Sequence, residues 1–213
     1  MAYDPRDYYF LQAKKENYVA RSIFKLKEID ERFKVFKPAQ KMLDLGAAPG
    51  SWSQYASERI GPKGRLLGVD LQAIELTLPN AYFFQGDLRE LSLEKLFEQT
   101  SISPPFDVVL SDMAPKTTGI RVTDQARSLE LCQKAFSCAE LFLKPKGTFI
   151  CKLFHSDEFE GLRKQLRAQF ARIEVLRPKS TRKESKEIFF IALQYLGNKK
   201  TPPTPQSSQS KES

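Results

Sequence analysis

A glycine-rich turn follows a short apolar run near the start of the chain, a pattern typical of a ligand-binding loop. Residues 42–45 read Met-Leu-Asp-Leu, and residues 46–52 continue Gly-Ala-Ala-Pro-Gly-Ser-Trp. Glycines let backbone pass close to a ligand, and the turn after the first strand of an open parallel sheet lies where ligands bind. The pyrophosphate fingerprint Gly-x-Gly-x-x-Gly is absent, and Pro49 removes one backbone donor. The turn favours a ligand without a pyrophosphate, although alone it does not exclude a dinucleotide.

Two acids follow the next two apolar runs. Asp70 ends the run 66–71, roughly 20 residues after the glycine turn, where an acid can accept from ribose hydroxyls. Asp87 follows the run 82–85 and could accept from an adenine amine. Either acid alone could equally be a helix N-cap, but three features at successive strand ends indicate an adenosine-containing ligand. NAD and S-adenosylmethionine both contain adenosine, and the missing pyrophosphate motif favours S-adenosylmethionine.

Asp112 and Lys152 are the residues best suited to proton chemistry. The chain has a single histidine, so carboxylates, lysines or tyrosines must carry any acid-base step. Asp112 follows the apolar run 108–110, and Lys152 interrupts the run 148–153. A lysine there is costly to desolvate unless it is paired or has a lowered pKa, although it could also snorkel from an edge strand. We expect these two strands to be close in the sheet, which favours a catalytic role for Lys152.

Four segments resemble the FtsJ-like family of RNA 2′-O-ribose methyltransferases, in particular the bacterial members that act on large-subunit ribosomal RNA. They are residues 21–29 (RSIFKLKEI), 43–54 (LDLGAAPGSWSQ), 111–115 (SDMAP) and 177–187 (RPKSTRKESKE). The resemblance extends from about residue 7 to residue 194. Two departures are Ser51, where the family often has a second glycine, and residues 116–119, which differ from the asparagine-containing bacterial version.

The resemblance implies a set of functional residues. The family's Lys-Asp-Lys-Glu catalytic tetrad falls on Lys25, Asp112, Lys152 and Glu187. Contacts to S-adenosylmethionine fall on Gly50, Trp52, Asp70, Asp87 and Asp112, and the glycine turn adds Gly46 and Pro49. No metal is required. Lys152 would orient or deprotonate a ribose 2′-hydroxyl; Lys25 lowers its pKa and the two acids raise it, so the net direction is left open.

The charge of the chain favours an anionic partner. With 34 Lys and Arg against 26 Asp and Glu, the net charge is +8 and the pI is about 9.3, which suits nucleic acid. Basic residues cluster near the start and the end of the chain. We expect RNA contacts from Lys14, Lys15, Arg21, Arg182 and Lys183, forming one surface if the fold joins the segments. The expected partner is 23S ribosomal RNA within the 50S subunit, with no DNA or membrane.

Alternating apolar and amphipathic segments predict an α/β fold, a Rossmann-like class I methyltransferase with a seven-stranded, mostly parallel sheet flanked by helices. The expected strands are 42–45, 66–71, 82–85, 108–110, 148–153, 173–176 and 188–193. The expected helices are 18–33, 51–59, 91–99, 123–143 and 156–170. Residues 145–147, Pro-Lys-Gly, should stop the fourth of these helices. We divide the chain into an N-terminal helical segment 1–40 packed on the catalytic domain, a methyltransferase domain 41–197 and a disordered tail 198–213.

Composition and length limit the location and the class of protein that we expect. No apolar run approaches the roughly 20 residues of a membrane span, and the start does not resemble a secretory signal, so we expect a cytoplasmic, monomeric enzyme with its three cysteines reduced and packed. A tRNA anticodon-loop methyltransferase is the nearest alternative, and a viral-type cap methyltransferase is disfavoured by the short chain. A non-catalytic RNA-binding ribosome-assembly factor and a nicotinamide dehydrogenase are alternatives from other classes.

Overall fold

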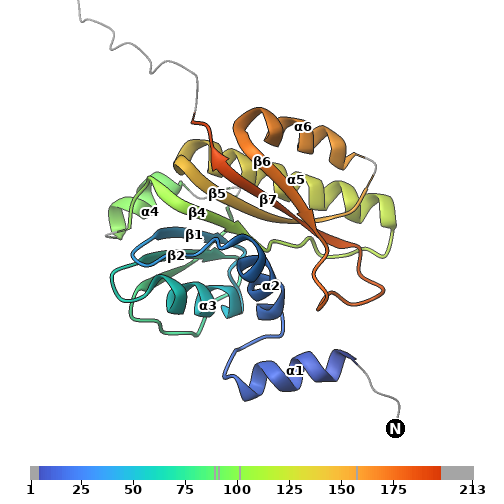
Figure 1. The fold of residues 1–213 in the computed structure, drawn as a ribbon, viewed down its shortest axis with the longest axis horizontal. Coiled ribbons are helices and arrows are strands. Elements are labelled where there is room, and N and C mark those ends of the chain that lie inside the picture. Colours follow the sequence, from blue (N-terminus) through green and yellow to red (C-terminus); the bar gives the residue numbers. More distant parts are fainter. Residues whose placement is uncertain (1–4, 89, 91, 101, 157, 198–213) are drawn as a thin grey trace, which may run out of the picture.

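The computed structural model describes residues 5–88, 90, 92–100, 102–156 and 158–197. A seven-stranded sheet of order β3-β2-β1-β4-β5-β7-β6 crosses the molecule (Figure 1). Its strands are β1 (Lys41–Leu45), β2 (Arg65–Asp70), β3 (Ala81–Gln85), β4 (Phe106–Ser111), β5 (Leu143–Phe154), β6 (Phe170–Leu176) and β7 (Glu187–Tyr195). β7 runs antiparallel to both of its neighbours, and the pairings from β3 to β5 are parallel. The predicted α/β class and mostly parallel sheet are confirmed.

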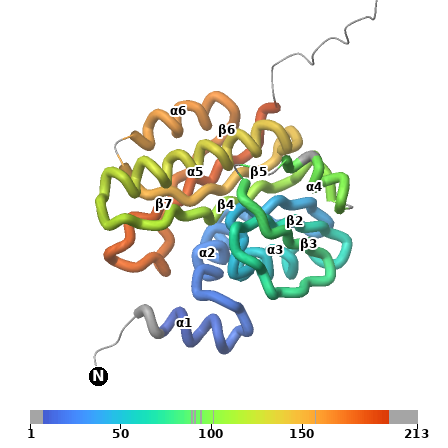
Figure 2. The backbone as a smooth tube through the Cα atoms, turned by 180° about the vertical axis from the view of Figure 1, so that it is seen from behind, coloured from blue at the N-terminus to red at the C-terminus, as the bar shows by residue number. Residues whose placement is uncertain are grey.

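Helices cover both faces of the sheet (Figures 1 and 2). They are α1 (Pro5–Lys15), α2 (Ile23–Phe33), α3 (Ser51–Ile60), α4 (Leu93–Gln99), α5 (Arg121–Phe142) and α6 (Phe159–Gln169). One apolar layer joins the sheet to α4, α5 and α6, and a second joins its other face to α2 and α3. Because both faces are covered, the central strand β1 is apolar at successive positions: Met42 packs in the second layer and Leu43 in the first.

The N-terminal segment differs from the prediction of one helix over 18–33. The structure has two helices, α1 and α2, joined by a connection over 16–22. Side chains from α3 and from the connection replace helical hydrogen bonds there. Gln54 accepts from the backbone of Val19 at 3.0 Å and donates to the carbonyl of Asn17 at 3.0 Å. These tertiary contacts to α3 therefore override the helical pattern at the N-terminal end of the predicted helix, and α2 begins only at Ile23.

The prediction that Pro145-Lys146-Gly147 ends the long helix and precedes the strand is wrong. α5 ends at Phe142, and β5 begins at Leu143, so these residues lie inside β5. The register with β4 shifts between Phe106 and Val108, and Lys146 has a positive φ of 65°. A Cβ on Gly147 would lie 2.8 Å from the backbone oxygen of Lys144. The register shift and the positive φ are thus accommodated inside β5 without ending the strand.

The remaining expectations agree with the structure within a few residues at the element ends. Residues 91 and 157, inside two of the predicted helices, lie outside the described residues, as does the predicted tail 198–213. The cysteines are buried and form no disulfide. Across the described ranges, no helix is both long and apolar enough to cross a membrane.

Candidate active site

Lys152 and Asp112 form a close pair at the carboxyl ends of β5 and β4. The two strands are hydrogen-bonded neighbours, with Ser111 opposite Cys151, so the residues that follow them project into the same region. Lys152 Nζ lies 2.9 Å from Asp112 Oδ1 and donates to the backbone oxygen of Asp112 at 2.6 Å. The lysine side chain is only 7% exposed and that of Asp112 is 18% exposed. A buried ammonium requires such partners, so the pair accounts for the lysine inside an apolar run.

Lys25 and Glu187 form a second ion pair beside the first. Lys25 Nζ lies 2.5 Å from Glu187 Oε2, with α2 supplying the lysine and the first residue of β7 the acid. Burial alone would raise the pKa of Glu187, but the positive charges of Lys25 and Lys152 outweigh it, and the pKa falls below its ordinary value. Glu187 is therefore held as a carboxylate.

The β5–β7 ladder joins the two pairs into one site. Phe189 is the register partner of Lys152, and its ring lies beneath Lys25, with Nζ 5.8 Å from the ring centroid. The electrostatic influence of Lys152 reaches Glu187. The structure thus brings together Lys25, Asp112, Lys152 and Glu187, which are far apart in the sequence.

The glycine turn lies beside this group, between the ends of β1, β2 and β4. Gly46 N donates to the carbonyl of Val69 at 2.8 Å, and Asp112 N donates to that of Leu45 at 3.1 Å. Gly46 has a φ of 76°, and a Cβ there would lie 2.8 Å from the backbone nitrogen of Met113. Only glycine fits this close approach of two loops.

The predicted ribose-binding acid faces the glycine turn. Asp70 Oδ2 accepts from the backbone N–H of Ala48 at 3.0 Å, and its Oδ1 accepts from that of Gln72 at 2.8 Å. Asp87 lies in the connection after the neighbouring strand β3, and Gly86 N donates to the carbonyl of Asp70 at 2.8 Å. Pro49 is exposed at the tip of the turn, whereas Gly50 is buried next to α3. These residues therefore lie at the same edge of the sheet.

Trp52 is buried next to the site and packs against the residues around it. The indole is 2% exposed, donates from Nε1 to the carbonyl of Ser22 at 3.0 Å, and packs on Phe189 with ring centroids 5.6 Å apart. Its side chain therefore links α3 to the start of α2 and to β7. With the indole engaged in this way, a cofactor contact from Trp52 would come from its backbone.

Asp44 is a buried acid of the site that the sequence interpretation passed over. Ser53 Oγ donates to its Oδ2 at 2.6 Å, while Oδ1 is buried without a hydrogen-bond partner among the described residues. Burial raises the pKa of Asp44 to about 7 against the opposing hydrogen bond from Ser53. The charges of Asp112 and Asp70 add to the rise. An acid inside a buried apolar strand was the available signal, the same one that identified Lys152.

The basic segments from the two ends of the chain meet beside the Lys25–Glu187 pair. Arg21 donates from Nη2 to the carbonyl of Ser180 at 2.8 Å, and the backbone N–H of Lys179 donates to Glu28 at 2.7 Å. Arg182 and Lys183 are exposed in the same connection between β6 and β7. Lys14 and Lys15 are exposed in the last turn of α1. The fold therefore joins the N-terminal connection to the segment that precedes Glu187.

The chain matches the FtsJ-like methyltransferase family over residues 18–195. It belongs to that family. It is 61% identical over 193 residues to the ribosomal RNA large subunit methyltransferase E of Bdellovibrio bacteriovorus, across 91% of this chain and 98% of that protein. The same-named protein of Oleidesulfovibrio alaskensis is 53% identical over 194 residues, across 90% of this chain and 93% of that protein.

A solved structure also supports the FtsJ-like assignment. A protein described as a ribosomal RNA methyltransferase from Plasmodium falciparum superposes with a TM-score of 0.75 at 29% identity, across 85% of this chain and 100% of that one. The present chain is accordingly a methyltransferase, and membership of the family implies a methyl donor of the S-adenosylmethionine type.

Proposed function

We propose that this FtsJ-like methyltransferase transfers a methyl group from S-adenosylmethionine to a ribose 2′-hydroxyl of large-subunit ribosomal RNA, a uridine of 23S RNA. The observation that carries the proposal is the convergence of two lysine–carboxylate pairs, Lys152–Asp112 and Lys25–Glu187, beside the glycine turn. The large-subunit RNA target follows the names of the two bacterial relatives, which share more than half of their residues with this chain.

The residues around the glycine turn fit S-adenosylmethionine. Asp70 and Asp87 follow adjacent strands, where they would hold the ribose and the adenine amine. Burial is the largest cause of the raised pKa of Asp44, and the negative field of Asp112 and Asp70 adds to it. Such a field favours a cationic ligand and disfavours an anionic pyrophosphate. Gly46, Pro49, Gly50 and Trp52 would border the ligand through their backbone.

We call Lys25, Asp112, Lys152 and Glu187 the catalytic group, and this group would position the ribose hydroxyl. When bound, S-adenosylmethionine supplies an electrophilic methyl group on a sulfonium. Asp112 engages two positions around the Lys152 ammonium, through its backbone oxygen and Oδ1. An ammonium has three N–H donors, and Lys152 uses one of them for the Asp112 backbone oxygen, so a donor remains for the ribose 2′-oxygen. Holding that oxygen next to the methyl group makes a bimolecular displacement effectively unimolecular.

Lys25 and Glu187 would bind and orient the rest of the target ribose. Glu187 is kept ionised by Lys25 and Lys152, so it accepts hydrogen bonds from sugar hydroxyls. Lys25 keeps its ammonium next to Glu187 and above Phe189. The proton of the attacking hydroxyl would pass to one of the two carboxylates of the site, Asp112 or Glu187, as the methyl group is transferred to the ribose oxygen.

RNA would lie on the basic surface that adjoins this group. Arg21, Arg182 and Lys183 border the joined N-terminal and 177–186 segments, and Lys14 and Lys15 extend the charge along α1. Lysine and arginine contacts to phosphates supply affinity without reading sequence. Their position beside Glu187 would direct a bound RNA strand over the Lys152–Asp112 pair.

Methyl transfer can be tested with labelled S-adenosylmethionine and large ribosomal subunits from cells that lack this protein. We expect the label on one ribose, identified by mapping 2′-O-methyl groups with and without the protein. Label on the tRNA anticodon loop would redirect the substrate assignment to transfer RNA. RNA binding without any transfer would indicate a non-catalytic assembly factor, and NAD binding in place of S-adenosylmethionine would contradict the cofactor.

A further inference from the structure

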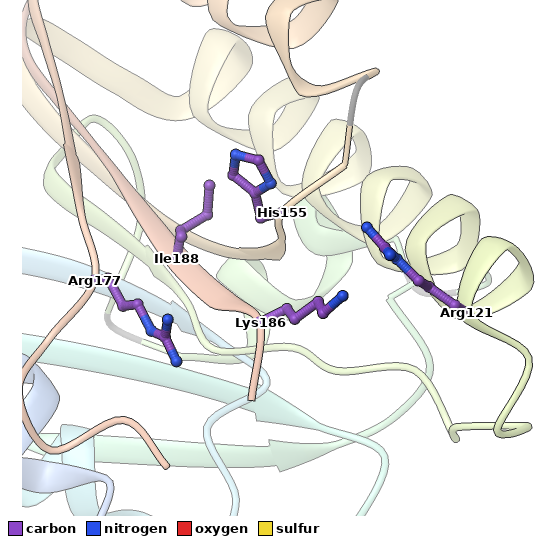
Figure 3. Close-up of a pocket in the computed structure, with 5 residues that line it drawn as sticks. All are labelled: Arg121, His155, Arg177, Lys186 and Ile188. Carbon is purple, nitrogen blue, oxygen red and sulfur yellow. The ribbon is translucent and has the colours of Figure 1, made fainter. Parts of the chain in front are cut away.

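A cavity of about 270 Å³ lies at the carboxyl edge of the sheet, outside the catalytic group. It is lined by Arg121, His155, Arg177, Lys186 and Ile188. Figure 3 shows that the four polar side chains come from different segments: the start of α5, the residue after β5, the residue after β6 and the residue before β7. Segments distant in the sequence thus converge on one cationic cavity.

Among the described residues, none that lines the cavity is acidic. Within the described ranges, no ion pair involves Arg121, Arg177 or Lys186. Arginine and lysine remain charged at neutral pH, so three cationic residues line a space that no described acidic residue lines. Solvated surface cations usually separate, because like charges repel. Here an anion would offset that repulsion.

Backbone contacts hold two sides of the cavity in place. Arg177 donates from Nη2 to the carbonyls of Lys183 and Ser185 at 3.0 and 2.8 Å, which leaves Nε and Nη1 for a ligand. The backbone N–H of His155 donates to the carbonyl of Lys186 at 2.9 Å, fixing the ends of β5 and β7 together. A guanidinium held in this way presents a fork that matches a phosphate oxygen pair.

The cavity and the catalytic group lie on opposite faces of the same sheet edge. Ile188 packs in the layer beneath α5, whereas Phe189 packs in the layer beside Trp52. Successive side chains of a strand point to opposite faces. Lys186 therefore enters the cavity on the α5 side, while Glu187 meets Lys25 on the α2 side.

We propose that the cavity of Arg121, Arg177 and Lys186 binds a backbone phosphate of the RNA substrate flanking the methylated nucleotide. This inference rests on the proposed function. A strand that presents its ribose to Lys25 and Glu187 crosses the sheet edge, and the next segment of its backbone reaches the cationic cavity. Neutral, small ligands are disfavoured by three converging positive charges, and a volume of about 270 Å³ accommodates a phosphate group.

The test replaces two lining cations that hold no described backbone contact with their side chains. Arg121→Gln combined with Lys186→Gln lowers the charge by two and leaves Arg177, which braces the connection, in place. The matched control is Lys134→Gln with Lys164→Gln, two exposed lysines on α5 and α6 that do not line the cavity. RNA affinity is measured at several salt concentrations, with phosphate-ethylation interference on the same RNA.

We expect the cavity variant to raise the RNA dissociation constant about tenfold near 0.1 M salt and to reduce the salt slope by about one. Ethylation of one phosphate next to the methylated nucleotide should weaken binding to the wild type and the control, but not to the cavity variant. Equal losses in both double variants would show a diffuse charge effect and overturn the inference. So would saturable inorganic phosphate binding with unchanged RNA binding, which would assign the cavity to a free anion. Methyl transfer by the wild-type protein is scored separately, so failure of the proposed function is distinguishable.

Discussion

Lys152 contacts Asp112 at two atoms, the carboxylate Oδ1 at 2.9 Å and the backbone oxygen at 2.6 Å. The backbone contact does not depend on the protonation of the acid, so the lysine keeps its position even when the carboxylate changes partners. This double contact fixes the head of Lys152 at the junction of β4 and β5. It explains how a buried ammonium is stabilised inside an apolar strand.

Replacing Lys152 with alanine should abolish methyl transfer, with a loss of at least about 100-fold, because the group that orients the hydroxyl is removed. S-adenosylmethionine binding should change little, since Asp70 and the glycine turn remain. Single-turnover methylation and calorimetric cofactor binding measure the two effects. Lys164→Ala, on the exposed face of α6, is the control. Normal turnover in Lys152→Ala would refute the catalytic assignment.

Lys25 and Glu187 should behave as one unit. Because their side chains contact at 2.5 Å, Lys25→Ala and Glu187→Gln should each lower the single-turnover rate by about 10- to 100-fold, and the double variant should be no worse than the more damaging single one. Rates measured for all four members of the cycle give the coupling. Losses that simply multiply would mean that the two residues act separately on the substrate.

Asp44 should make stability depend on pH between its two pKa values. Its pKa rises from 3.8 to about 7 on folding. Below about pH 4 the acid is protonated in both states. As the pH rises towards 7, the unfolded chain loses the proton and the folded chain keeps it, so the wild type loses stability relative to Asp44→Asn by up to about 4 kcal/mol.

Chemical denaturation of the wild type and Asp44→Asn from pH 4 to pH 8 measures this difference. Glu98→Gln removes an exposed acid on α4 and serves as the control. A difference between Asp44→Asn and the wild type that stays constant across this range would show that Asp44 is ionised in the folded protein, contrary to the argument from its burial.

Trp52→Phe should affect stability more than cofactor affinity. The change removes the hydrogen bond to the carbonyl of Ser22 and part of the packing on Phe189, which should lower the free energy of unfolding by about 1–3 kcal/mol. The dissociation constant of S-adenosylmethionine should change less than about threefold, because a backbone contact survives. A rise above about tenfold with unchanged stability would place the indole itself against the cofactor.

The sequence alone predicted that the glycine turn and the strand-end acids lie at one edge of the sheet, for a specific physical reason. Parallel strands end at the same edge, so Gly46, Asp70 and Asp112 had to meet once the strands were recognised. The neighbouring position of Lys152 also followed, because β4 and β5 pair directly. Lys25 and Glu187 came from resemblance to a family, since no local pattern relates residues 162 positions apart.

Other features could not be read from local patterns. The start of α2 at Ile23 depends on side chains of α3, and the irregular start of β5 depends on its pairing with Phe106 in β4. The apolar neighbours of Asp44 in the sequence indicate a buried position, but only the structure shows that it is fully buried and lies near Asp112 and Asp70, which together decide its protonation. Each of these outcomes is set by groups contributed from elsewhere in the chain.

The sequence by itself determined the order of elements, the glycine turn and the chemical types available for catalysis, because these depend on periodicity and on side-chain chemistry. Only the tertiary structure decided that Lys25 meets Glu187, that Trp52 faces the core, and that cations from three segments share one cavity. Such contacts depend on how helices pack on the two faces of the sheet, and the energies that fix that packing are sums over many residues distant in the chain.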